Sequence, residues 1–288
     1  MQQRQALTAI HLTALLFGLT GVFGHMIQAE PFAITSGRAA FAVLTLMVFA
    51  RSQGRSLLAG LDPRRVLALT VSGALLASHW VTFFVAVKIG GVAVATLGFA
   101  SVPAFTVLLE RLVYRDRIGA AEWWLLALVS FGLVLVAPAF DLADTGTVGV
   151  LWGVLSGFSF AVLALVNRWT AGNLDSIQVA CWQNGVVLAL TLPFGLAGLA
   201  GLQAPDWFAL AALGIFCTGL AHYLFVSSLS RLNARTAGMV IALEPVYAIL
   251  AAWLLFGDRP TLRMLLGAGC ILGATVATTL RRRRAAAG

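Results

Sequence analysis

Apolar residues fall into long, nearly uninterrupted blocks along the chain, separated by short segments that carry charges, Pro and Gly. Each block is close to the ~20 residues that an α-helix needs to cross a bilayer. A membrane-spanning β-strand needs only ~10 residues of alternating polarity, whereas these blocks are longer and apolar on both faces. The pattern predicts an all-α integral membrane protein with ten transmembrane helices, over residues 6–27, 31–50, 64–87, 91–113, 121–138, 147–167, 175–198, 205–229, 233–256 and 261–280.

Composition supports the membrane class. Of the 288 residues, 60% are hydrophobic and only 10% are charged, whereas about a quarter of a soluble domain is charged. Cys181, Cys217 and Cys270 lie far apart inside apolar blocks, without the spacing of a metal or redox centre. We interpret them as buried apolar residues, and we predict no metal site and no cofactor.

Basic residues gather in alternate loops, which explains the net charge of +8 without nucleic-acid binding. If both termini are cytoplasmic, fifteen of the nineteen basic residues lie on the cytoplasmic side, as the positive-inside rule requires. The sequence therefore predicts a multi-pass protein of the bacterial inner membrane with both termini in the cytoplasm. The run Arg281–Arg284 is either the anchor that ends the last span or a patch for lipid headgroups.

The two halves of the chain resemble each other. The segment 99–105 aligns with 241–247, and at the same offset Asp116-Arg117 aligns with Asp258-Arg259. We predict two domains, residues 1–140 and 141–288, with five helices each. Because five is odd, the second repeat is inverted relative to the first, an arrangement typical of transporters that open a midplane site to each side in turn.

The ten spans, the five-plus-five repeat and the Glu244-Pro245 step, followed by an apolar run into Gly257-Asp258, resemble the drug/metabolite transporter superfamily and, within it, the EamA-type ten-span exporters. The resemblance covers nearly the whole chain, although the first repeat has Val102 where the second has Glu244. It implies helices from both repeats around a central cavity, with the fifth and tenth helices at the periphery. The family includes exporters of amino acids, other metabolites and drugs, so it leaves the substrate open.

Arg38 and Glu244 lie well inside predicted spans, where a charge costs several kcal/mol unless it faces a cavity or a partner. Glu244 can attract a substrate ammonium or take up a proton, or it can be a buried carboxyl that fixes the helix beside Pro245. Arg38 can bind the carboxylate of an amino acid. Alternatively, Arg38 reaches toward the interface or pairs with a helix carbonyl.

Polar and aromatic side chains elsewhere in the spans complete the candidate lining. His79-Trp80 and His222-Tyr223 occupy similar places late in the third and eighth spans, as cavity lining or as packing residues. Gln183 and Asn184 offer amide groups that bind zwitterions without being ionised. The predicted substrate site comprises Arg38, His79, Trp80, Phe99, Ser101, Trp152, Trp182, Gln183, Asn184, His222, Tyr223, Glu244 and Tyr247.

Proline and glycine mark places where helices bend or approach each other. Proline frees a carbonyl one turn earlier and bends a helix, which makes Pro103 and Pro245 candidate kinks for gating. Gly18 and Gly21 lie on the first span at a three-residue spacing. Small residues let helices pack closely in lipid, and such a seam is compatible with sliding during transport.

These features predict a secondary transporter that exports small metabolites, with amino acids, aromatic ones included, as the preferred class. The partners expected are a small-molecule substrate and the lipid bilayer, with no nucleic acid. A multidrug or other metabolite exporter is the alternative within transporters, and a non-transporting scaffold or receptor is the alternative from another class. The sequence has no catalytic motif such as HExxH or GxSxG, which argues against an enzyme.

Overall fold

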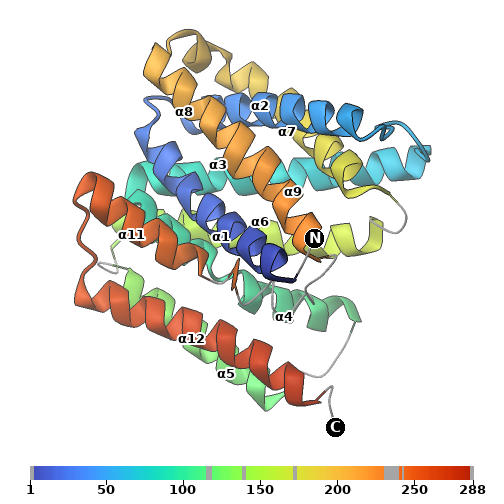
Figure 1. Cartoon of the computed structure of the whole chain (residues 1–288). Coiled ribbons are helices and arrows are strands. Elements are labelled where there is room, and N and C mark those ends of the chain that lie inside the picture. Colours follow the sequence, from blue (N-terminus) through green and yellow to red (C-terminus); the bar gives the residue numbers. More distant parts are fainter. Residues whose placement is uncertain are drawn as a thin grey trace.

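The computed structural model describes residues 3–114, 119–137, 141–170, 174–229, 240–241 and 243–285. Regular structure within these residues is helical throughout (Figure 1). In chain order the elements are α1 (Gln3–Met26), α2 (Pro31–Ser52), α3 (Pro63–Phe99), α4 (Val102–Tyr114), α5 (Ala120–Val136), α6 (Thr145–Thr170), α7 (Ser176–Ala200), α8 (Ala204–Gly214), the π-helix η1 (Ile215–Leu220), α9 (Ala221–Leu229), α11 (Glu244–Phe256) and α12 (Leu262–Ala285).

Within the described residues, six helical segments are long and apolar enough to cross a membrane: Arg4–Met26, Pro31–Ser52, Pro63–Phe99, Thr145–Asn167, Ser176–Ala200 and Ala204–Phe225. Shorter apolar helices cover Glu122–Val136, Glu244–Phe256 and Leu262–Ala274. The protein is therefore an all-helical, multi-span protein, as predicted. The predicted ninth span, 233–256, begins outside the described residues, and only its later part is seen as α11.

The third and fourth predicted spans agree with the structure at one break and differ at another. The sequence predicts separate helices over 64–87 and 91–113, and a kink at the non-helical Gly91 divides α3 into two helices at the predicted place. Gly91 has φ 83° and ψ 170°, a conformation that residues with a Cβ rarely adopt. The helix then stops after Phe99, and α4 begins at Val102. The predicted fourth span is thus two helical pieces.

Proline begins a helix at the corresponding place in each half. Pro103 is the second residue of α4, and Pro245 is the second residue of α11. A proline in the first turn removes no helical hydrogen bond, because the N–H groups there lack intrahelical partners. The two aligned prolines therefore mark the starts of helices within interrupted spans.

Small residues set the closest helix contacts. An added Cβ on Gly90 would lie 3.0 Å from Gly149 Cα, and one on Gly98 would lie 3.0 Å from Gly153 Cα. These contacts hold α3 against α6, one helix from each half, with the backbones nearly touching. The helices α5 and α12 lie side by side at one edge of the bundle (Figure 1).

The helix bundle has two ends, which differ in the turns and loops that they carry. The 27–30 end carries the turn between α1 and α2, and the 53–62 end carries the loop between α2 and α3. At the 53–62 end Arg55 pairs with Asp175, and the Gln178 amide donates to the carbonyls of Leu57 (3.0 Å) and Ala59 (2.9 Å). These contacts attach the loop to the start of α7.

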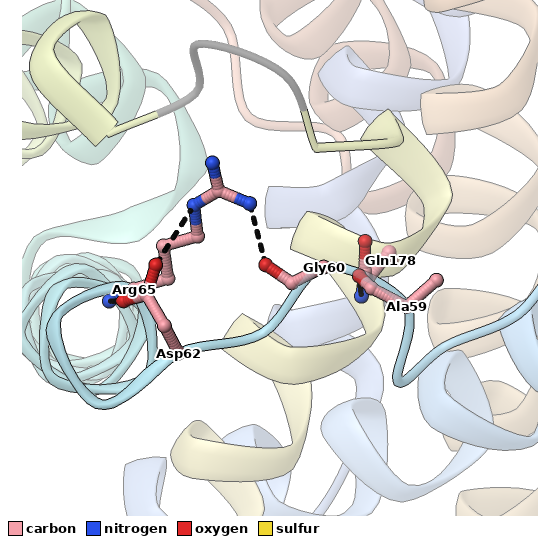
Figure 2. A network of polar contacts seen from close by, with 5 residues as sticks. All are labelled: Ala59, Gly60, Asp62, Arg65 and Gln178. Atoms are coloured by element: carbon pink, nitrogen blue, oxygen red, sulfur yellow. Dashed lines mark hydrogen bonds and ion pairs between the residues drawn. The ribbon is translucent and has the colours of Figure 1, made fainter.

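Figure 2 shows the same loop turning into α3. Arg65 lies 3.4 Å from the Asp62 carboxylate and donates to the Gly60 carbonyl, while Asp62 accepts from the Arg65 backbone N–H and caps α3. Gln178 reaches the loop from α7 at Ala59. The loop is therefore fixed from two sides.

Candidate functional site

Arg38 is a buried cation in the middle of a membrane helix. It lies two turns into α2, and only 5% of its surface is exposed. Its Nε donates to Thr218 Oγ1 at 2.7 Å, and its guanidinium carbon lies 3.8 Å from the centre of the Trp80 ring. A cation over a tryptophan face is attracted by the ring's quadrupole. Thr218 therefore binds one edge of the guanidinium, and the Trp80 ring covers one of its faces.

The π-helix η1 supplies the hydroxyl that fixes Arg38. Thr218 in η1 donates its own hydroxyl hydrogen to the Leu213 carbonyl at 3.0 Å, which leaves its oxygen to accept from Arg38. Single-turn π-helices occur frequently at functional sites. The two terminal nitrogens of Arg38 make no hydrogen bond within the described part of the chain. Four N–H donors are therefore available to a bound anion.

Glu244 lies within electrostatic range of Arg38. Its carboxylate forms no hydrogen bond and no ion pair with any described residue. Arg38 comes from the first half of the chain and Glu244 from the second. A basic and an acidic side chain, one from each half of the chain, thus lie near each other without a direct ion pair. That arrangement suits a ligand carrying both charges.

His79 forms a reciprocal hydrogen-bonded pair with Ser156. The Ser156 hydroxyl donates to the His79 carbonyl at 3.0 Å, and its oxygen lies 2.7 Å from His79 Nδ1. When the hydroxyl hydrogen goes to the His79 carbonyl, the Ser156 oxygen accepts from Nδ1–H, and Nε2 of the neutral ring is then the acceptor. Ser156 on α6 therefore holds the imidazole of a histidine on α3.

Aromatic rings surround His79. Phe99 stacks on the imidazole with ring centres 4.9 Å apart, and Phe160 meets it edge-on at 5.0 Å. We call His79, Phe99, Phe160 and Ser156 the His79 cage. His79 and Arg38 are within electrostatic range of each other, and Trp80 follows His79 directly on α3. The cage and the charged pair are therefore parts of one region.

Ser101 and Trp152 lie beside this region. Ser101 occupies the break between α3 and α4, and its buried hydroxyl has no hydrogen-bond partner in the described chain. An added Cβ on Gly157 would lie 2.6 Å from that hydroxyl. Trp152, one turn before Ser156 on α6, packs partly buried against the cluster that contains Trp80 and Phe83. The structure brings both predicted residues close to the cage.

The side chains of Trp182, Gln183 and Asn184, which are consecutive on α7, have different surroundings. Gln183 donates to Ser72 Oγ (3.0 Å) and to Asn167 Oδ1 (2.7 Å). Asn184 donates to the Ala180 carbonyl, and its own buried Oδ1 has no partner among described residues. Trp182 instead donates to the Leu57 carbonyl at the 53–62 end. Trp182 on α7 is therefore bonded to the loop between α2 and α3, and none of its described contacts involves the His79 cage.

The surroundings of His222-Tyr223 differ from those of His79-Trp80. Tyr223 meets Phe49 with ring centres 5.1 Å apart, and the buried Nε2 of His222 has no partner in the described residues. Both lie on α9, near the 53–62 half of the bundle. None of the contacts described for His222 and Tyr223 involves the His79 cage, although the sequence positions of the two histidines correspond.

The small residues of α1 face the start of α11 and the bend of α3. An added Cβ on Gly18 would lie 2.9 Å from both the Glu244 carbonyl and Tyr247 Cβ. One on Gly21 would lie 3.0 Å from Val92. Gly18 therefore sets how closely α1 approaches Glu244 and Tyr247.

Sequence reasoning missed Thr218, Ser156 and Phe160. Thr218 carried no visible signal, because a π-helix is not apparent from an apolar pattern. Trp152, Ser156 and Phe160 did carry one, since they recur every four residues and so share a face of α6. That stripe faces His79.

Comparison with known proteins agrees with this architecture. A model described as the EamA-like transporter family matches residues 4–137 and again 147–280. A solved structure that is 20% identical superposes with a TM-score of 0.65, covering 98% of this chain and 99% of that one. The fold of this chain is therefore that of a known structure.

Named relatives are transporters. An uncharacterized transporter of Bacillus subtilis is 24% identical over 98% of this chain and 92% of its own length. A riboflavin transporter of Rhizobium johnstonii is 27% identical over 82% of this chain and 76% of its own. An S-adenosylmethionine uptake transporter of Rickettsia bellii is 25% identical over 86% and 84%. The names indicate transport and not enzymatic catalysis.

Proposed function

Because this chain belongs to the EamA-like transporter family, we propose that it is a secondary transporter that exports amino acids, aromatic ones included, from a bacterial cell by alternating access. The observation that carries the proposal is the pair of opposite charges, Arg38 and Glu244, contributed by different halves of the chain and not joined in an ion pair. An amino acid zwitterion matches this pair. The aromatic rings beside it suit an apolar side chain.

The proposed topology has ten crossings and both termini in the cytoplasm, with residues 1–140 and 141–288 as the two inverted repeats. The two family matches, 4–137 and 147–280, support this division. Arg51, Arg55, Arg64 and Arg65 all belong to the 53–62 end or its flanks, which favours that end as cytoplasmic. The 27–30 end is then the outer face.

In the proposed binding mode the substrate carboxylate accepts from the free N–H groups of Arg38, and its ammonium faces Glu244. His79 presents Nε2 as an acceptor for a third donor. A bidentate bond between a guanidinium and a carboxylate is one of the strong hydrogen-bonded pairs in proteins. Since the sequence has no nucleotide-binding motif, we propose that the gradient of the solute or of protons drives transport.

Efflux from cells loaded with dipeptides tests the proposed substrate class. Cells producing the protein should release one or more amino acids faster than cells producing Arg38→Gln, in which the carboxylate partner is lost. Glu244→Gln tests the ammonium partner in the same assay. The control is Arg259→Gln, which removes an exposed cation at the 27–30 end and should leave efflux unchanged.

Equal release by wild type and Arg38→Gln, with both present in the membrane, would reject the proposed binding mode. No release of any amino acid by the wild type would reject the substrate class. A chain that moved no solute at all in vesicles would instead be a scaffold or receptor.

A flat heteroaromatic or sulfonium metabolite is the second candidate. The relatives named for riboflavin and S-adenosylmethionine favour it, and so does the stacked ring of Phe99 on His79, because aromatic faces bind flat ring systems. Adding riboflavin or S-adenosylmethionine as a competitor in the efflux assay separates the candidates. Competition by either compound at lower concentration than any amino acid would favour this second class.

A further inference from the structure

The last turn of α1 is capped by a lysine from another helix. Lys88 on α3 donates its ammonium to the Ile27 carbonyl and, at 3.4 Å, to the His25 carbonyl. Carbonyls at a helix C-terminus lack intrahelical partners and carry the negative end of the helix dipole. The positive charge of Lys88 therefore matches the negative end of α1. Because Lys88 belongs to another helix, its hydrogen bonds join α1 to α3 at the 27–30 end.

An aspartate joins the same turn to α8. Asp206 is only 8% exposed, and its Oδ1 accepts from the Gln28 backbone N–H at 2.8 Å. Its Oδ2 accepts from the Gln203 N–H at 3.3 Å, so the same carboxylate also caps its own helix. Lys88 and Asp206 attract each other electrostatically. We call Lys88, Asp206 and the backbone of residues 25–28 the 27–30 clasp.

Tightly packed apolar residues lie between the clasp and the Arg38 site. Ile27, Phe84 and Val87 are fully buried, and Val22 is nearly so. An added Cβ on Gly24 would lie 2.5 Å from the Phe84 ring, and Phe84 also lies under the Arg38 guanidinium. The part of the bundle between Arg38 and the 27–30 turn is therefore filled by side chains.

The surroundings of the clasp allow it to open. Lys88 lies just before the bend at Gly91, whose φ of 83° departs from helical geometry. Asp206 keeps the Gln203 N–H as a partner if Gln28 moves away. Lys88 would lose its two carbonyl partners. The hydrogen bonds between residues 25–28 and the side chains of Lys88 and Asp206 are therefore the contacts that opening must break.

We propose that the 27–30 clasp is the outer gate of the transporter: it holds α1, α3 and α8 together while the Arg38 site is closed to the outside, and it must separate for outward release. The inference rests on the proposed function for the orientation of the bundle. A cap that served stability alone would stay closed throughout the cycle. A gate must open without unfolding.

Cys217 offers a natural reporter for this opening. It is fully buried on η1, one residue before the partner of Arg38. A background of Cys181→Ser with Cys270→Ser leaves it as the single thiol in the chain. The measurement is the rate at which a membrane-impermeant maleimide, added outside intact cells, labels Cys217. Substrate is not required, so the result does not depend on the identity of the solute.

Lys88→Met keeps the apolar stem of the lysine and removes its charge, and Asp206→Ala removes the bond to Gln28. Each should raise external labelling of Cys217 by about tenfold, because a charge-assisted hydrogen bond worth about 1.4 kcal/mol shifts the closed-to-open equilibrium by that factor. Lys88→Arg restores a carbonyl donor and should label near the wild-type rate. Arg259→Gln, an exposed cation on the same end, is the matched control.

Unchanged labelling in both Lys88→Met and Asp206→Ala would overturn the clasp as a gate, even if amino acid efflux were observed. Faster labelling only from the cytoplasmic side, in inverted vesicles, would overturn its assignment to the outer face. Faster external labelling in a protein that exports no amino acid would support the gate and reject the substrate class alone. If Lys88→Met does not accumulate in the membrane, Asp206→Ala decides the question by the same measurement.

Discussion

At the scale of single residues, the site is built from side chains whose partners lie far away in sequence. Arg38 could be recognised from the sequence, because a cation inside an apolar block needs a cavity or a partner. Its actual contacts, Thr218 and Trp80, could not, because they depend on how η1 and α3 pack against α2. The residue was predictable, and its orientation was not.

The tautomer of His79 gives a test at this scale. Ser156→Ala removes the oxygen that receives the Nδ1 proton and the hydroxyl bound to the His79 carbonyl. The ring is then free to place its proton on either nitrogen, and Nε2 is no longer fixed as an acceptor. We expect the KM for transport to rise severalfold, since a lost neutral hydrogen bond costs about 1 kcal/mol.

Ser159→Ala is the control for Ser156→Ala. Ser159 lies on the same helix, and its hydroxyl lies 3.2 Å from that of Ser78 on α3, but its described hydrogen bonds do not include His79. Its removal should leave the KM close to that of the wild type. An equal rise in both variants would show that Ser156 acts only through packing between α3 and α6.

At the scale of elements, the sequence predicted most helix positions and the break near Gly91, but not the break after Phe99. The bounds of α2 and α7 lie within two residues of those predicted, because charges and loop residues flank clear apolar blocks. The break after Phe99 was missed, since Val102 and its neighbours are as apolar as any span. Hydropathy reports burial in lipid, and it does not report whether a helix is continuous.

The contact of α1 with α11 gives a prediction for an element. Gly18→Ala places a methyl group 2.9 Å from the Glu244 carbonyl, and because that atom is backbone, the helices must separate. Overpacking of this kind costs about 1–3 kcal/mol, which exceeds the gain of about 1 kcal/mol from replacing glycine by alanine within a helix. We expect a lower thermal unfolding midpoint for purified protein in detergent.

Gly269→Ala is the matched substitution, because an added Cβ there meets nothing within 4 Å. It should hold or raise the unfolding midpoint through helix propensity alone. A Gly18→Ala protein as stable as Gly269→Ala would mean that α1 and α11 are not in the close contact described.

At the scale of the whole molecule, the arrangement depends on the pairing of two halves, each of which matches the family model. The Arg38–Glu244 pair, the contact of α3 with α6 and the His79 cage all combine residues from both halves. The aligned breaks at Pro103 and Pro245 are consistent with a repeat. The sequence indicated the repeat, but it could not show that His79 and His222 have different surroundings.

The orientation of the two halves gives a prediction for the complete chain. An odd number of crossings in each repeat, and an even total, place both termini on the same side of the membrane. Reporters fused to each terminus should therefore both be active only in the cytoplasm. Reporters active on different sides would contradict the ten-span arrangement.

Counterflow of labelled phenylalanine into vesicles that contain the purified protein and unlabelled phenylalanine tests the central claim most directly. The account predicts transient accumulation of label by the wild type without ATP, and loss of that accumulation in Arg38→Gln, with Arg259→Gln like the wild type. Accumulation that persisted unchanged in Arg38→Gln would contradict the claim that the solute passes between the opposed charges of the two halves.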